Sequence, residues 1–134
     1  MPQPKRILFM CVENAGRSQM TEGFFRKYAP QGYEPQSAGT KPLGQINPLV
    51  IKAMAEVGID ITSQKPKVIS DSMVNQASRV VNMGCMDKTS CPALSVNDVS
   101  DWSIPDPKGK PIDEVRQIRD LIEKRIQELC KTLQ

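Results

Sequence analysis

The 134-residue chain contains no histidine, and this excludes several kinds of active site. Ser–His and Cys–His dyads need an imidazole as general base, and His-ligated metal sites need one as a ligand. Any general acid in this protein must therefore be a carboxyl group or a less common donor.

Aromatic residues and long apolar runs are also scarce. Two Tyr, three Phe and one Trp are too few for base-stacking platforms, and a net charge of +3 is far from the dense basic surface of a nucleic-acid binder. No apolar stretch approaches the roughly 20 residues that span a bilayer, and the N-terminus leads into only about four apolar residues, too few for a signal peptide. We expect a cytoplasmic protein that binds neither nucleic acid nor membranes.

Length and composition indicate one ordinary domain. A chain of 134 residues that is 39% apolar and 25% charged can bury one sheet-and-helix core, so we expect residues 1–134 to form a single domain. Four cysteines would suggest two structural disulfides in a secreted chain, whereas in a reducing cytosol they favour redox or catalytic chemistry.

Short apolar runs alternate with helical patterns along the chain. We expect strands at 5–10, 33–38, 79–83 and 98–104, and helices at 18–28, 47–58, 70–77 and 111–129. Strands that alternate with helices form right-handed βαβ units. The sequence therefore predicts an α/β fold, with a four-stranded parallel sheet and helices on both of its faces.

The segment that follows the first predicted strand is Cys11, Val12, Glu13, Asn14, Ala15, Gly16, Arg17 and Ser18. In a short loop before a helix, backbone N–H groups can converge on a tetrahedral anion, and the same positive field favours a thiolate at Cys11. A buried structural cysteine and a surface arginine are the simpler interpretation. The preceding strand, the small loop residues and the following helix favour function, so we predict a nucleophile at Cys11 and an oxyanion-binding loop at 12–18 that includes Arg17.

Other reactive side chains follow the later predicted strands. Cys85 and Cys91 come after the strand at 79–83, and Asp106 comes after the strand at 98–104. Because sites in parallel sheets lie at the carboxyl ends of strands, we expect Cys85 and Asp106 near Cys11. For Cys85 and Cys91, the simpler interpretations are half of a metal site or two incidental cysteines. For Asp106, the simpler interpretation is an ordinary Asp-Pro turn. With no histidine and only Cys130 left over, which we expect to be buried in the last helix, a zinc site is poorly supported.

The loop resembles the anion loop of the low-molecular-weight tyrosine phosphatase fold, in which the nucleophile lies near the N-terminus. Within that fold, the sequence resembles the thioredoxin-coupled arsenate reductases. The matching stretches are Arg17-Ser18-Gln19-Met20 with Glu22-Gly23, Ser37-Ala38-Gly39-Thr40 and Gly58-Ile59-Asp60-Ile61. The resemblance extends over residues 5–125, which is nearly the whole chain.

This resemblance implies the reduction of arsenate to arsenite by three thiols. Cys11 attacks arsenic while Arg17 and the loop amides stabilise the anion, and Asp106 protonates the leaving oxygen. Cys85 then attacks Cys11, Cys91 attacks Cys85, and thioredoxin or a similar dithiol protein reduces the final disulfide. The ligand is arsenate, with phosphate or sulfate as analogues, and we expect a monomer.

The resemblance also gives roles to neighbouring residues. Ser18 would hydrogen-bond the thiolate, and Asn14 would brace the loop. Glu13 is an unexpected acid in an anion loop, and we expect its side chain to point outward. Gly16 stands where relatives commonly carry cysteine.

Neither a metal nor an organic cofactor is expected. Some relatives bind potassium near the positions that match Asn14, Glu22 and Ser37. The sequence lacks an anchoring acid around Lys67, so we do not predict this ion.

Two other functions remain open. A low-molecular-weight protein tyrosine phosphatase would share Cys11, Arg17 and Asp106 but would not need the cysteine pair. Lys108-Gly109 stands where such phosphatases usually carry aromatics, which favours a small inorganic substrate. A non-catalytic oxyanion-binding module would bind the anion without turnover. Weak phosphatase activity is expected beside the reductase, since phosphate and arsenate have similar shape and charge.

Overall fold

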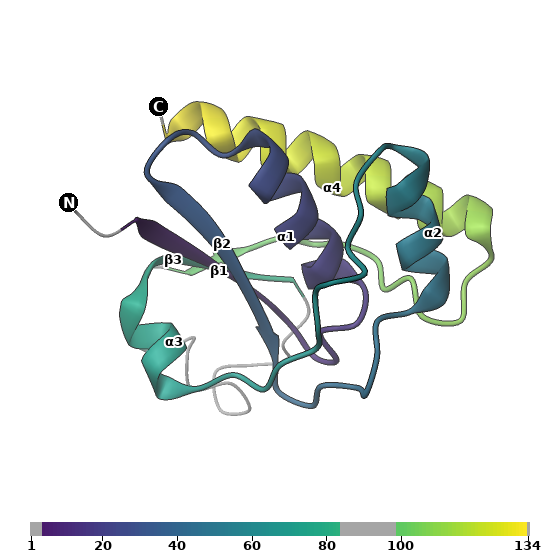
Figure 1. The fold of residues 1–134 in the computed structure, drawn as a ribbon, viewed down its shortest axis with the longest axis horizontal. Helices are drawn as coiled ribbons and strands as arrows, with labels where there is room; N and C mark the ends of the chain where they lie inside the picture. Colours follow the sequence, from purple (N-terminus) through teal and green to yellow (C-terminus); the bar gives the residue numbers. More distant parts are fainter. Residues whose placement is uncertain (1–3, 84–98, 134) are drawn as a thin grey trace.

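The computed structural model describes residues 4–83 and 99–133 (Figure 1). Its elements are β1 (Lys5–Cys11), α1 (Arg17–Tyr28), β2 (Tyr33–Gly39), α2 (Pro48–Glu56), α3 (Asp71–Gln76), β3 (Ala77–Asn82), β4 (Val99–Asp101) and α4 (Ile112–Thr132). The strands form one four-stranded sheet in the order β2-β1-β3-β4, and each pair of neighbours is parallel. The predicted α/β fold is confirmed.

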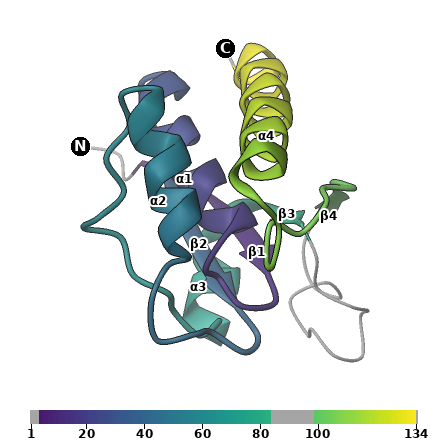
Figure 2. The same cartoon turned by 90° about the vertical axis from the view of Figure 1, so that its right-hand side faces the viewer.

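Strand β1 lies inside the sheet, and its side chains alternate between two apolar layers. Ile7, Phe9 and Cys11 face the larger core, which is built with α1, α2 and α4. Leu8 and Met10 face a smaller core that includes Val74 of α3 and residues of β2 and β3. A strand buried on both faces must be apolar at successive positions, and this explains the uninterrupted run from Ile7 to Met10. Helices therefore cover both faces, as Figure 2 shows.

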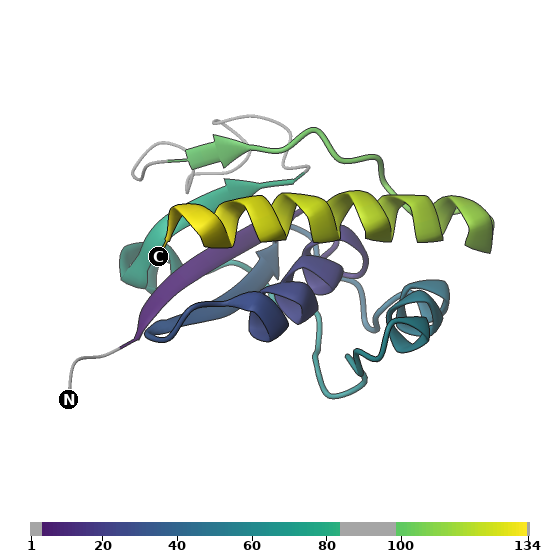
Figure 3. The ribbon, with the colours of Figure 1, turned by 90° about the horizontal axis from the view of Figure 1, so that it is seen from above.

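Helices α1 and α4 lie side by side on the same face of the sheet (Figure 3). The apolar stripe of α4 recurs every three or four residues, so one side of the helix is buried against the sheet. Phe9 of β1 packs against Phe25 of α1 with 5.6 Å between the ring centroids. Each large apolar side chain that is fully buried contributes about 1.5–3 kcal/mol, so this contact fixes α1 firmly on β1.

Helix α2 begins as the sequence predicts. The Asn47 side chain accepts a hydrogen bond from the Leu49 amide at 2.9 Å, and Pro48 occupies the first helical position. None of the helices in the described part of the chain combines the length and apolarity needed to span a bilayer.

Two strand boundaries differ from those expected. Strand β3 begins at Ala77 rather than Arg79, because α3 ends at Gln76 and the chain passes directly into the sheet. Strand β4 ends at Asp101, whereas we expected a strand up to Ile104. Its partner β3 ends at Asn82, opposite Asp101, and beyond that point the Ile104 carbonyl accepts a hydrogen bond from Arg17 Nη1 at 3.1 Å.

Candidate active site

The predicted oxyanion loop, residues 12–18, runs from the end of β1 into the first turn of α1 at the carboxyl edge of the sheet (Figure 1). Gly16 is the residue before the helix, and its carbonyl accepts the first helical bond from Met20 at 3.0 Å. Within the described residues, no side chain caps this helix end. Its first amides, with the positive end of the helix dipole, are therefore suited to binding an anion.

Cys11 lies at the end of β1 with its sulfur beside a hydroxyl group. Its Sγ is 2.9 Å from Ser18 Oγ, and the residue is 2% exposed. Asn14 Nδ2 donates to the same Oγ at 2.7 Å. The Ser18 oxygen accepts from Asn14 and keeps its own proton, so the hydroxyl can donate to the sulfur of Cys11.

Asn14 holds the loop through a buried hydrogen-bond network. It adopts a left-handed backbone conformation with φ of 50°, which Asn tolerates better than most residues. Its Oδ1 accepts from the Lys67 amide at 2.8 Å and from Gln19 Nε2 at 3.1 Å. Gln19 Nε2 also donates to the Asn14 carbonyl at 2.9 Å. We did not assign a role to Gln19 from the sequence, because a polar residue is unremarkable in a helix as polar as α1.

Gly39 lies directly behind the loop. It is the last residue of β2 and pairs with Cys11 in the parallel ladder. A Cβ at this position would lie 2.5 Å from the Val12 carbonyl oxygen and 2.8 Å from that of Cys11. Only glycine permits the two backbones to approach so closely.

Arg17 connects the loop to the segment that follows β4. Its Nη1 donates to the Ile104 carbonyl, and its Nη2 lies 3.6 Å from Asp106 Oδ2. Asp106 Oδ1 also accepts from the Lys108 amide at 3.0 Å. The fold thus brings Asp106, which is half exposed, to the side chain that closes the oxyanion loop.

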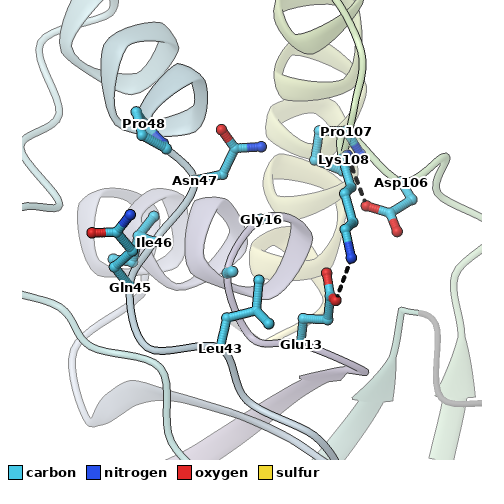
Figure 4. A pocket seen from close by; sticks show the side chains of 11 residues that line it. Glu13, Gly16, Leu43, Gln45, Ile46, Asn47, Pro48, Asp106, Pro107 and Lys108 are labelled. Carbon is cyan, nitrogen blue, oxygen red and sulfur yellow. Dashed lines mark hydrogen bonds and ion pairs between the residues drawn. The ribbon is translucent and has the colours of Figure 1, made fainter.

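Pro107 packs directly on the loop. A Cβ at Gly16 would lie 2.8 Å from Pro107 Cγ, so glycine allows the turn at 106–108 to approach closely. Lys108, in the same turn, reaches the loop with its side chain: its Nζ lies 2.7 Å from Glu13 Oε2 (Figure 4). This hydrogen bond raises the pKa of the Lys108 ammonium. The Glu13 carboxylate thus lies at the solvent-facing edge of the site, which we call the rim, and the Lys108 ammonium balances its negative charge.

A cavity of about 230 Å³, which we call the rim cavity, lies between the oxyanion loop, the turn at 106–108 and the segment before α2. Its lining combines loop residues with residues of the turn and of the segment before α2. They are Glu13, Ala15, Gly16, Leu43, Gln45, Ile46, Asn47, Pro48, Asp106, Pro107 and Lys108.

Behind the loop, the buried carboxylate of Glu22 already has protein partners. It accepts from Ser37 Oγ at 2.6 Å and pairs with Arg26 at 3.1 Å, while Lys67 Nζ lies at 3.8 Å. In residues 4–83 and 99–133, no group of three or more acidic or cysteine side chains is placed to hold a metal ion.

The remaining cysteines fall into two groups. Cys85 and Cys91 lie outside the described residues. Cys130 is buried in α4 as expected, and burial raises the pKa of its thiol, which favours the unreactive form.

A cysteine at the end of a parallel strand, a short loop that leads into an uncapped helix N-terminus and an arginine in its first turn are the features of a cysteine-dependent oxyanion site. The chain belongs to the family described as low molecular weight phosphotyrosine protein phosphatase, whose model matches residues 6–134.

Within this family, the chain is similar to arsenate reductases. It is 39% identical to an arsenate reductase of Bacillus cereus (strain AH187), and the match covers 98% of both chains. It superimposes on an arsenate reductase in its phosphate-binding state with a TM-score of 0.86, 27% identity and coverage of 97% and 99%. A thioredoxin-dependent arsenate reductase of Corynebacterium glutamicum gives a TM-score of 0.81 and 34% identity, over 97% of this chain and 62% of the other. The resemblance predicted from the sequence is confirmed.

Proposed function

We propose that this protein reduces arsenate to arsenite by thiol–disulfide exchange. One observation carries the proposal: the full-length similarity to arsenate reductases occurs in a chain in which Cys11 contacts Ser18 and Arg17 pairs with Asp106 at the same edge of the sheet. The reaction needs two electrons, and two thiols that form a disulfide supply them.

The first step forms a bond between sulfur and arsenic. Arsenate binds to the amides of the oxyanion loop and to the Arg17 guanidinium, which neutralise its charge. The Cys11 thiolate attacks arsenic, and one As–O bond breaks. The departing oxygen is the hydroxyl of hydrogen arsenate, and Asp106 gives it a second proton, so that it leaves as water. Arsenic is still As(V) in this covalent adduct.

The second step transfers the electrons. The Cys85 thiolate attacks the Cys11 sulfur, a disulfide forms, and the S–As electron pair remains on arsenic. Arsenic leaves as arsenite, As(III), and the two sulfurs have together lost two electrons. Cys91 then attacks Cys85, which releases the Cys11 thiolate and forms a Cys85–Cys91 disulfide. Thioredoxin or a similar dithiol protein reduces this bond. The assignment of Cys85 and Cys91 rests on their sequence positions and on the family.

The test follows arsenate-dependent consumption of reducing equivalents in the presence of thioredoxin. We expect Cys85→Ser and Cys91→Ser to abolish steady-state turnover, and Cys91→Ser to accumulate a Cys11–Cys85 disulfide that peptide mass spectrometry detects. Cys130→Ala removes a buried thiol outside the relay and should turn over like the parent. Full activity in Cys85→Ser or in Cys91→Ser would overturn the proposal.

Phosphatase activity is the second candidate, because the chain belongs to a phosphatase family. It needs Cys11, Arg17 and Asp106 but not the cysteine pair. Slow hydrolysis of an aryl phosphate that persists in Cys91→Ser would show that the side reaction is present. Anion binding without any turnover would instead identify a non-catalytic oxyanion-binding module.

We also propose that the protein works as a single-domain monomer in the cytoplasm. The relay needs three reduced thiols, and these persist in a reducing compartment. Gel filtration with light scattering tests the monomer, and cell fractionation tests the location.

A further inference from the structure

An ion pair joins the two sides of the rim. Glu13 belongs to the oxyanion loop and Lys108 to the turn after Asp106, and they lie 95 positions apart in sequence. Their charged atoms are 2.7 Å apart, although the Lys108 side chain is 64% exposed. The reaction proposed above uses neither side chain.

The rim cavity offers apolar surface next to this ion pair. Leu43, Ile46, Pro48 and Pro107 contribute to its lining, together with both charged residues. Figure 4 shows the ion pair between Asp106 on one side and Leu43 and Ile46 on the other. The pair therefore lies between the proposed proton donor and the part of the apolar lining that Leu43 and Ile46 form, while Pro107 lies beside Asp106.

The chemistry of phosphate esters gives this position a consequence. In an ester, one oxygen of the anion carries an organic group, and that oxygen must face Asp106 to receive a proton. The organic group then lies at the rim beside Asp106, and it is stabilised only where it can bury apolar surface. The Glu13–Lys108 pair lies between Asp106 and the apolar side chains of Leu43 and Ile46, so it occupies the space that the organic group would cross to reach them. A free oxyanion carries no organic group and does not meet this obstacle.

We propose that the Glu13–Lys108 ion pair is a barrier that selects free inorganic oxyanions against anions that carry an organic group. This inference rests on the proposed function, because it names the substrate class of the same site. The pair excludes such groups from the rim cavity by occupying the rim and by requiring any occupant to separate two matched charges. Lys108 and Glu13 thus determine specificity and do not act on the reacting atoms.

The test compares two ligands that differ only in the organic group. Inorganic phosphate and phenylphosphonate are both dianions at mildly alkaline pH, and calorimetry measures the dissociation constant of each. The informative variant is Glu13→Ala/Lys108→Ala, because it removes one charge of each sign and leaves the net charge of the rim unchanged. The matched control is Lys110→Ala/Glu114→Ala, which removes an exposed Lys–Glu pair outside the lining of the rim cavity.

We expect the preference for phenylphosphonate over phosphate, taken as the ratio of their dissociation constants, to rise about tenfold in the first double variant and to remain at the parent value in the control. A rise of less than threefold would overturn the barrier. Lys108→Ala alone should weaken the binding of both ligands, because it removes a positive charge, and Glu13→Ala alone should strengthen it. Each single variant should nevertheless raise the preference for phenylphosphonate over phosphate.

Binding needs no turnover, so this result remains readable if the arsenate assay fails. An active arsenate reductase whose ratio does not change would refute the barrier alone.

Discussion

The Ser18 hydroxyl lies 2.9 Å from the sulfur of Cys11, at the point where β1 meets α1. The hydroxyl oxygen accepts a hydrogen bond from Asn14, and the hydroxyl can donate its own proton to the sulfur. A serine at the first turn of a helix is usually explained by helix formation. Its position beside Cys11 leads us to predict that it supports the proposed nucleophile.

Replacement of Ser18 by Ala should slow the reaction of Cys11 with alkylating reagents. A hydrogen bond to a charged group contributes about 1.5–3 kcal/mol, so we expect at least a tenfold lower rate with iodoacetamide at neutral pH. Mass spectrometry of the peptide that contains Cys11 measures this rate. Ser78→Ala removes an exposed hydroxyl on β3 and is the control. Equal rates in both variants would show that Ser18 does not support the thiolate.

Replacement of Asp106 by Asn should lower arsenate turnover by about 10²–10⁴-fold, the usual contribution of a general acid. Phosphate binding should not weaken, because the change removes a negative charge 3.6 Å from Arg17. Steady-state kinetics and calorimetry measure the two effects separately. Asp113→Asn changes an exposed aspartate in the first turn of α4 and serves as the control. A turnover in Asp106→Asn within a few-fold of the parent would remove Asp106 from the mechanism.

Replacement of Gly39 by Ala should damage the oxyanion loop from behind. The new Cβ would meet two carbonyl oxygens at 2.5 and 2.8 Å, and Gly39 cannot retreat because its amide and carbonyl bond to Lys67 and Ile69. Overpacking of this kind costs about 1–3 kcal/mol.

We expect a lower melting temperature for Gly39→Ala and a smaller increase in that temperature on addition of phosphate. Gly44→Ala is the matched control, because a Cβ there meets no atom within 4 Å. A phosphate effect of the parent size in Gly39→Ala would contradict the close packing of β2 on the loop.

Glu56 should make stability depend on pH. It joins α2 to α4 through Arg116 and Arg119, and the hydrogen bond from Arg116 is the main cause that lowers the Glu56 pKa to about 2. Because the folded state holds this carboxyl deprotonated, its contribution is present above the ordinary pKa, about 4.3, and is lost as the pH falls toward 2.

The measurement is the difference in melting temperature between the parent and Glu56→Gln as a function of pH. We expect the parent to be more stable at neutral pH and the difference to close between about pH 4.5 and 2. Glu114→Gln, at an exposed position on α4, is the control and should show little difference at any pH. A gap for Glu56→Gln that is constant over this range would contradict the role of the ion pair.

The structural elements that depend on residues close together in the sequence were predictable. The apolar run of β1 and the stripe of α4 follow from the periods of strand and helix, and both elements form where we expected them. The loop was equally clear, because Cys11, Arg17 and Ser18 lie within eight residues and their relation depends on one strand, one turn and one helix. Strand β4 was predicted too long, since its ladder ends at the pair Asn82–Asp101, where its partner β3 also ends.

The sequence by itself determined the parallel α/β fold and marked Cys11 and its loop as the candidate site, because these depend on local periodicity and on short-range geometry. The strand pattern also predicted Asp106 at the same edge of the sheet, but only the tertiary structure decided which side chains touch there. It brought Asp106 to Arg17, paired Glu13 with Lys108, and set the Lys67 amide on Asn14. Such contacts depend on how the sheet orders its strands and how the loops at its carboxyl edge pack, and no local pattern in the chain encodes that packing.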